Sequence, residues 1–122
     1  MKQNIFLCLL LFLGFFSCKN EITGQTKSKD IETQFKNDSG ILIDVRTLEE
    51  WNEGHHPKAI HSDWNSGEFK EQSLKWDPNK AYYLHCAAGG RSGKATEYLK
   101  AKGFKKVYNL GGYDDVKKLK LE

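Results

Sequence analysis

Residues 81–92 read AYYLHCAAGGRS, an apolar and aromatic run followed by a cysteine, a loop of small residues and the start of a helix. The segment Ala81–His85 is typical of a buried strand, because aromatic residues are enriched in strands. A helix is predicted to begin near Arg91 and to continue to Lys102. This stretch therefore places the thiol of Cys86 between the carboxyl end of a strand and the beginning of a helix.

Strand and helix patterns alternate on both sides of this stretch. Ile41–Val45 is a continuous apolar run, typical of a strand buried on both faces of a parallel sheet. Thr47 and Glu50 fit a capping box at the start of a short helix that ends near Gly54. The remaining expected elements are helices over Asp30–Asn37, Ser66–Leu74 and Asp114–Lys120, strands over Ala59–His61 and Lys106–Leu110, and a turn at Gly111 and Gly112. This alternation predicts an α/β fold with an open parallel sheet, helices on both faces and a ligand site at the carboxyl ends of the strands.

The loop after Cys86 has the composition of an anion-binding loop. Four residues without bulky side chains separate Cys86 from Arg91, namely Ala87, Ala88, Gly89 and Gly90. Their backbone N–H groups are free to turn toward the sulfur, and the N-terminus of the next helix adds positive potential. Together with the cation of Arg91, these features predict a lowered pKa and a nucleophilic thiolate at Cys86. The alternative is a buried structural cysteine beside an ordinary glycine turn.

The N-terminal residues have the pattern of a secretory signal. An apolar run from Ile5 to Phe16 follows Lys2 and is shorter than the roughly 20 residues of a membrane-spanning helix. Residues 15–18, FFSC, resemble a lipobox, in which the cysteine is lipidated and becomes the mature N-terminus. We therefore expect a signal peptide over residues 1–17, a lipid-anchored tether over residues 18–29 with the lipid on Cys18, and the folded domain over residues 30–122. Signal cleavage without lipidation is the alternative.

Export would explain why Cys86 stands without a disulfide partner. Cys8 is removed with the signal and Cys18 carries the lipid, so Cys86 is the one cysteine left in the domain. The expected location is the bacterial cell envelope, as a periplasmic or surface lipoprotein that meets the membrane only through its lipid anchor.

The composition argues against several other kinds of ligand. A formal net charge of +3 is too small and too dispersed for nucleic-acid binding. His55, His56 and His61 lack a recognisable metal-ligand pattern. We therefore expect no nucleic acid and no metal. The protein is also expected to be a monomer and to act without an organic cofactor.

Several motifs stand in order over residues 30 to 113. They are Ile43-Asp44-Val45-Arg46, then Glu50-Trp51 with Gly54–Ile60, then Cys86–Ser92, and finally Gly103-Phe104 with Leu110-Gly111-Gly112. Together they resemble the rhodanese-like domain, the family of single-domain sulfurtransferases. His56 and Lys58 depart from the residues usual in that family, and the tryptophan usual after the double glycine is missing after Gly112. The resemblance implies the rhodanese-like α/β fold.

The resemblance also implies sulfur transfer through a persulfide on Cys86. The thiolate would take a sulfane sulfur from a small anionic donor such as thiosulfate and pass it to cyanide or a thiol. The implied catalytic residues are Cys86 and Arg91. The implied substrate-binding residues are Ala87, Ala88, Gly89, Gly90, Ser92 and Arg46. For Arg46, a structural ion pair is the alternative.

Two other functions compete with sulfur transfer. Cysteine phosphatases resemble this architecture but have a longer, wider loop between cysteine and arginine, so the shorter loop here favours sulfur over phosphate. The second is a binding or sensing module, in which the loop holds an anion or a partner without turnover.

Overall fold

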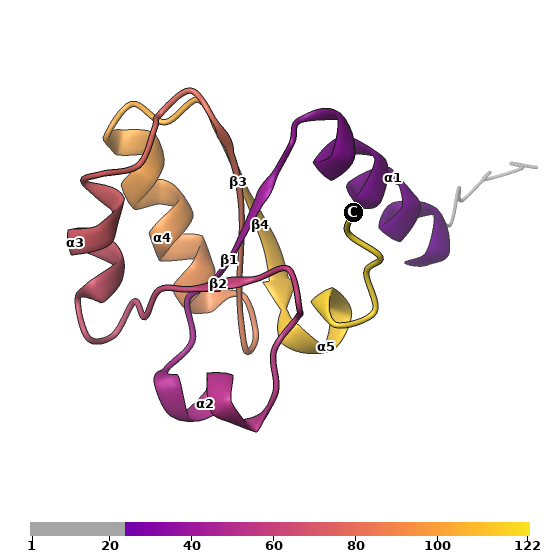
Figure 1. Cartoon of the computed structure of the whole chain (residues 1–122), viewed down its shortest axis with the longest axis horizontal. Coiled ribbons are helices and arrows are strands. Elements are labelled where there is room, and N and C mark those ends of the chain that lie inside the picture. The colour runs from indigo at the N-terminus through magenta and orange to yellow at the C-terminus, as the bar shows by residue number, and fades with distance from the viewer. Residues whose placement is uncertain (1–23) are drawn as a thin grey trace, which may run out of the picture.

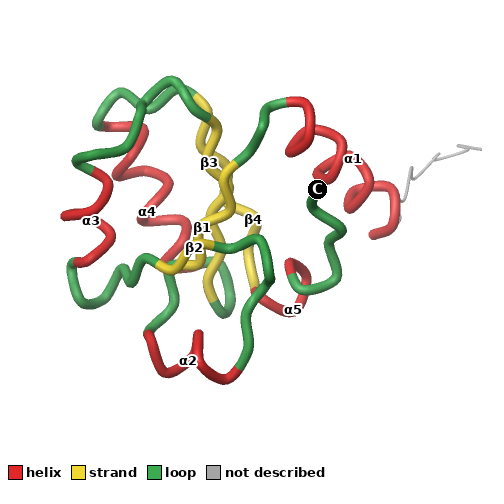
Figure 2. Tube along the Cα trace, viewed as in Figure 1, coloured by secondary structure: helices red, strands yellow, loops and turns green. Residues whose placement is uncertain are grey.

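The computed structural model describes residues 24–122, in which helices surround one four-stranded sheet (Figure 1). Figure 2 shows strands and helices alternating along the chain. The elements are α1 (Gly24–Asn37), β1 (Ile41–Asp44), α2 (Leu48–Glu53), β2 (Ile60–His61), α3 (Glu68–Ser73), β3 (Ala81–Cys86), α4 (Gly90–Ala101), β4 (Lys106–Gly112) and α5 (Tyr113–Val116). The predicted α/β class is confirmed.

The strands are all parallel and lie in the order β2-β1-β3-β4. The chain passes outward from β1 to β2, crosses back to β3 and continues outward to β4, so the strand order reverses between β1 and β3. Ligands of such sheets bind beside the carboxyl ends of the two strands at this reversal. Arg46 follows β1 and Cys86 ends β3, so both residues lie at this position.

Each face of the sheet has its own hydrophobic cluster. Figure 1 shows α3 and α4 on one face and α1 and α5 on the other. β3 contributes to both clusters, because successive side chains of a strand point to opposite faces. Tyr82 and Leu84 pack in the cluster of α3 and α4, while Ala81 and Tyr83 pack in the cluster of α1 and α5. Every residue of β3 is buried, which explains why the strand is apolar and aromatic apart from His85.

Three of the differences between the predicted and the observed element boundaries affect the description of the fold. The first helix begins at Gly24 rather than at Asp30, so residues 24–29, predicted as tether, are helical; no proline interrupts them. Gly111 and Gly112, predicted as a turn, belong to β4 and pair with His85 and Cys86. The last helix covers Tyr113–Val116 rather than Asp114–Lys120.

Tertiary contacts explain why the last helix is short. Leu119 and Leu121 are buried in the cluster of α1 and α5. The amide of Lys58 donates to Nδ1 of His56, so Nε2 of His56 carries the ring proton and donates it to the carbonyl of Leu119 at 2.9 Å. The amide of Lys120 donates to Glu32 at 2.8 Å. These contacts join the C-terminal residues to distant segments. The helical periodicity of the C-terminal sequence cannot predict them.

The predicted signal peptide, Cys18 and residues 18–23 of the predicted tether lie outside the described residues. Within residues 24–122, no helix has the length and apolar character needed to cross a bilayer.

Candidate active site

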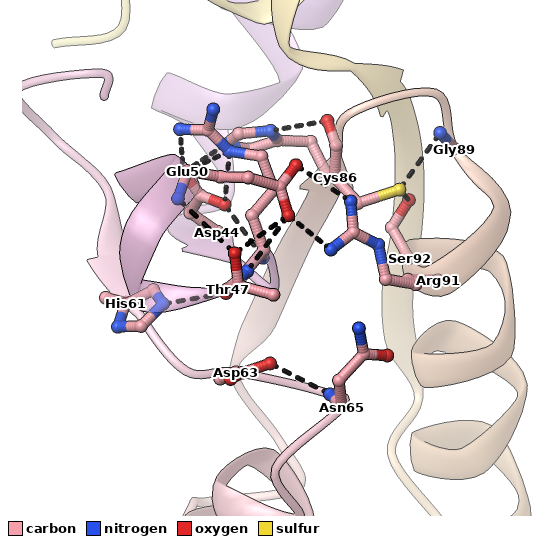
Figure 3. Close-up of polar contacts among 12 residues, drawn as sticks. Asp44, Thr47, Glu50, His61, Asp63, Asn65, Cys86, Gly89, Arg91 and Ser92 are labelled. Carbon is pink, nitrogen blue, oxygen red and sulfur yellow. Dashed lines mark hydrogen bonds and ion pairs between the residues drawn. The ribbon is translucent and has the colours of Figure 1, made fainter. Parts of the chain in front are cut away.

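Cys86 ends β3 in the cluster of α3 and α4, and the residue is only 1% exposed. Its Sγ accepts a hydrogen bond from the amide of Gly89 at 3.0 Å and lies 3.4 Å from the hydroxyl oxygen of Ser92. Figure 3 shows Gly89 and Ser92 reaching the sulfur from the loop and from the start of α4. Gly89 has a φ of 95°, a left-handed conformation that strains any residue with a side chain. The glycine therefore lets the loop turn its amides toward the sulfur.

Hydrogen bonding decides the ionisation of this thiol. Burial raises the pKa of Cys86, but the hydroxyl of Ser92 and the amides of Ser92, Ala88 and Gly89 outweigh burial and lower the pKa to about 7. The thiolate is the nucleophilic form of cysteine. A large share of Cys86 is therefore nucleophilic at neutral pH.

Strand β4 holds the loop in this position. The side-chain amide of Asn109 donates to the carbonyl of Gly89 at 3.1 Å, and its Oδ1 lies 2.7 Å from the hydroxyl of Ser92. A Cβ built on Gly112 would lie 2.7 Å from the carbonyl oxygen of Ala87. The loop backbone thus packs directly on the backbone of β4. The Ser92 hydroxyl has one proton and two acceptors within reach, Asn109 Oδ1 and the sulfur, and the charged thiolate is the stronger acceptor of the two.

Arg91 reaches from α4 to α2, where it forms a two-pronged ion pair with Glu50 (Figure 3). Its Nη1 and Nη2 donate to Oε1 and Oε2 of Glu50 at 2.6 and 3.0 Å. Glu50 also completes the predicted capping box, because its Oε1 accepts from the amide and the hydroxyl of Thr47. The hydrogen bonds from Arg91 hold the pKa of Glu50 down to about 2. Sequence reasoning assigned Glu50 to capping and missed this ion pair, since the two residues meet only through the fold.

Arg46 is held in a buried ion pair with Asp44. Its Nε and Nη2 donate to the Asp44 carboxylate at 3.0 and 2.7 Å, and Nη2 also donates to the carbonyl of Gly54 at 2.8 Å. The guanidinium lies over the ring of Tyr113, 4.1 Å from its centroid. These contacts are those of a structural ion pair, which the sequence offered for Arg46 as the alternative to substrate binding.

The histidines make structural contacts at separate places. His85 points to the face opposite Cys86, where it stacks on Tyr113, and burial lowers its pKa, so it is neutral at pH 7. His55 stacks on Trp51 of α2 and bonds the Trp51 carbonyl at 2.9 Å, so it fixes its loop to α2. In the part of the chain that the structure describes, no group of three or more His, Cys, Asp or Glu residues could hold a metal ion.

A family model described as the rhodanese-like domain matches residues 27–119. The chain belongs to the rhodanese-like family. The match covers all four strands, the loop of Cys86 and the Glu50–Arg91 pair, so the family resemblance predicted from the ordered motifs is confirmed.

Curated relatives of this rhodanese-like chain are named as a hydroxylase, as a putative sulfur carrier protein or as a putative sulfurtransferase. A tRNA uridine(34) hydroxylase from Buchnera aphidicola subsp. Baizongia pistaciae is 32% identical over 82% of this chain and 33% of its own length. A putative sulfurtransferase from Bacillus subtilis (strain 168) is 41% identical over 58% of this chain and 67% of its own length. The chain thus spans about a third of the length of the hydroxylase.

Solved rhodanese-like structures share the architecture. A rhodanese with anions from E. coli is 35% identical, with a TM-score of 0.56 over 62% of this chain and 89% of that one. A rhodanese-like domain protein from Staphylococcus aureus is 28% identical, with a TM-score of 0.58 over 75% of this chain and 94% of that one. The predicted rhodanese-like parallel sheet with helices on both faces is confirmed.

Replacing Ser92 by alanine in this rhodanese-like site should raise the pKa of Cys86 by roughly one unit, because the thiolate loses its hydroxyl donor. The pH dependence of Cys86 alkylation by iodoacetamide measures the midpoint, which should be about 7 in the unmodified protein. Ser73→Ala is the matched control, because it removes a buried hydroxyl from α3 that bonds the carbonyl of Lys70. An unchanged midpoint in Ser92→Ala would show that the amides alone set the pKa.

Proposed function

We propose that this protein is a sulfurtransferase that carries a sulfane sulfur as a persulfide on Cys86. The supporting observation is the hydrogen bonding of Sγ by the Gly89 amide and the Ser92 hydroxyl in a loop that lowers the pKa of the thiol to about 7. A persulfide anion needs the same donors as a thiolate, so a site that stabilises one also stabilises the other. The name of the Bacillus subtilis relative, putative sulfurtransferase, supports the same reaction.

Sulfur loading breaks one S–S bond and forms another. The Cys86 thiolate attacks the sulfane sulfur of a donor such as thiosulfate. Sulfite leaves with the electron pair of the broken bond, and Cys86 becomes a persulfide anion. An acceptor, cyanide or a thiolate, then attacks the terminal sulfur and regenerates the Cys86 thiolate. The reaction is covalent catalysis in two half-reactions, for which ping-pong kinetics are expected.

The residues around Cys86 have distinct parts in this reaction. The amides of Ala88 and Gly89 and the hydroxyl of Ser92 stabilise negative charge on sulfur. The guanidinium of Arg91 lies beside the same atom (Figure 3), and attraction to Cys86 contributes, after the hydrogen bonds to Glu50, to raising the pKa of Arg91. Neither half-reaction needs a metal or an organic cofactor.

Intact-mass measurement tests the proposal. Protein incubated with thiosulfate under non-denaturing conditions should gain one sulfur atom, and cyanide should remove it again as thiocyanate. Cys86→Ala should gain none. If the unmodified protein stays at its original mass with thiosulfate and also with a thiosulfonate or an organic persulfide, the sulfurtransferase proposal is wrong.

The burial of Cys86 supports a second candidate, a module that binds an anion or a partner without turnover. The residue is 1% exposed, so a donor reaches the sulfur only if the loop around Cys86 moves aside. Binding of thiosulfate by calorimetry without any mass gain would favour this candidate.

The reaction named for the hydroxylase relatives is not proposed for this chain. The match covers 33% of the length of the first of these relatives. In addition, a net charge of +3 is too small to indicate RNA binding. The proposed partners are a small anionic sulfur donor and a cyanide or thiol acceptor, and the proposed state is a monomer.

We also propose that the protein is exported to the cell envelope and anchored by a lipid on Cys18. The support is the sequence pattern of residues 1–18, an apolar run that ends in Phe15-Phe16-Ser17-Cys18. Such an anchor would be the protein's contact with the membrane, with the folded domain held beyond it.

A further inference from the structure

Both arginines of the sequence lie at the carboxyl edge of the sheet, and each is neutralised by a carboxylate. Arg46 pairs with Asp44 at 2.7 Å, and both side chains are buried. Arg91 pairs with Glu50 at 2.6 Å, with side chains that are 23% and 29% exposed. The site therefore presents two neutral ion pairs, whereas the sequence predicted a cation at Arg91 and left an ion pair open for Arg46.

The Arg91–Glu50 pair is the one that faces the sulfur. In Figure 3 the guanidinium of Arg91 lies between the Glu50 carboxylate and the thiol of Cys86. A donor that approaches Cys86 therefore meets the field of the pair, in which the charge of Glu50 offsets the charge of Arg91. Coulomb interactions of this kind are strong near a partly buried site, because little water screens them.

Glu50 is fixed in place and remains ionised. Its carboxylate accepts from the amide and the hydroxyl of Thr47 as well as from Arg91, so three groups determine its orientation. The hydrogen bonds from Arg91 keep its pKa at about 2, so no change of pH in the physiological range releases Arg91. The neutralisation of Arg91 is thus a permanent feature of the folded site.

We propose that Glu50 sets the charge preference of the sulfur donor: by neutralising Arg91, it favours donors with one negative charge over donors with two. This inference rests on the proposed sulfurtransferase function. Thiosulfate carries two negative charges, whereas an organic persulfide or a thiosulfonate carries one. With a thiosulfonate, the Cys86 thiolate takes the sulfane sulfur, and a sulfinate leaves with the electron pair of the broken S–S bond. Singly charged organic sulfane compounds are therefore the donor class that this site fits.

The test compares two donors in Glu50→Gln. Glutamine keeps the size of the side chain and an acceptor oxygen for Thr47, and it removes the charge. The measured quantity is kcat/KM for sulfur loading of Cys86. It is determined with toluenethiosulfonate, which carries one negative charge, and with thiosulfate, which carries two. In Glu50→Gln, the ratio of kcat/KM for thiosulfate to that for toluenethiosulfonate should rise about tenfold, because Arg91 then attracts the second charge. A changed pKa of Cys86 would alter both rates together and cancels in this ratio.

Glu49→Gln is the matched control, because it makes the same charge change on an exposed neighbour in α2. Its ratio should equal that of the unmodified protein. The tenfold gain in Glu50→Gln should also shrink as salt is added, which a purely structural change would not do.

A ratio that stays the same in Glu50→Gln, with both donors still loading Cys86, would overturn the inference and leave the proposed function intact. If neither donor loads the unmodified protein, the proposed function itself has failed. Should Glu50→Gln not fold, the unmodified protein still decides: a steep fall of kcat/KM for thiosulfate with added salt would reveal an uncompensated cation and refute the inference.

Discussion

Replacing Arg91 by alanine should lower kcat/KM for sulfur loading of Cys86 by about 100-fold, the usual effect of losing one donor to a developing charge. Two losses act together. The sulfur loses a neighbouring guanidinium, and Glu50 keeps a negative charge that nothing neutralises, because Arg91 is its ion-pair partner. That charge repels the thiolate, so the pKa of Cys86 should rise above its value of about 7. Loading rates with thiosulfate and the pH midpoint of iodoacetamide alkylation measure the two effects.

The double variant Glu50→Gln with Arg91→Ala separates these causes. It should recover part of the loading rate and return the pKa of Cys86 toward that of the unmodified protein, because the unpaired carboxylate is gone. Arg91→Lys keeps the charge without the two-pronged geometry and should fall between the extremes. Loading in Arg91→Ala at the rate of the unmodified protein would refute a role for Arg91 in stabilising the charged sulfur.

Replacing Gly112 by alanine should damage both the stability and the active loop. The new Cβ would lie 2.7 Å from the carbonyl oxygen of Ala87 and 3.6 Å from Cα of Ala88, and both are backbone atoms that cannot rotate away. The loop must shift relative to β4, which should lower the free energy of unfolding by about 1–3 kcal/mol. Because the same shift moves the amides that face Cys86, loading should slow by about tenfold or more. Urea unfolding and intact-mass kinetics give the two values.

Gly90→Ala is the matched control for Gly112→Ala. Gly90 begins α4, its backbone is not left-handed, and a Cβ there has no heavy atom within 4 Å. Alanine favours the helix, so this variant should be as stable as the unmodified protein or slightly more stable. Equal effects of the two substitutions would show that the close contact between the loop and β4 is not what positions the amides.

The parts of the fold that could be predicted are those that depend on residues close together in the sequence. The buried strand Ala81–Cys86 and the helix beginning at Gly90 follow from an apolar run and a following loop of small residues. The capping box of Thr47 and Glu50 was predicted from residues three positions apart, and both of its bonds form. These predictions succeed because each depends on neighbours in the chain.

The boundaries that failed depend on distant contacts. The last helix ends at Val116. After it, Leu119 and Leu121 are buried in a hydrophobic cluster with Phe35 of α1. Gly111 and Gly112 read as a turn by composition, and they become strand because the chain pairs them with His85 and Cys86. The spacing of side chains within a segment does not indicate which distant segment it will contact, so neither the cluster with α1 nor the pairing with β3 could be predicted.

The sequence by itself determined a nucleophile, a loop and a cation: Cys86 at a strand end, small residues whose amides can face it, and Arg91 at the start of the next helix. The tertiary structure decided how that cation is presented. By placing α2 beside α4, it pairs Arg91 with Glu50, so the charge beside the sulfur is largely cancelled. The reason is physical: a charge acts through space on whatever the fold brings near it, and residues 50 and 91 become neighbours only when β1 and β3 pair side by side.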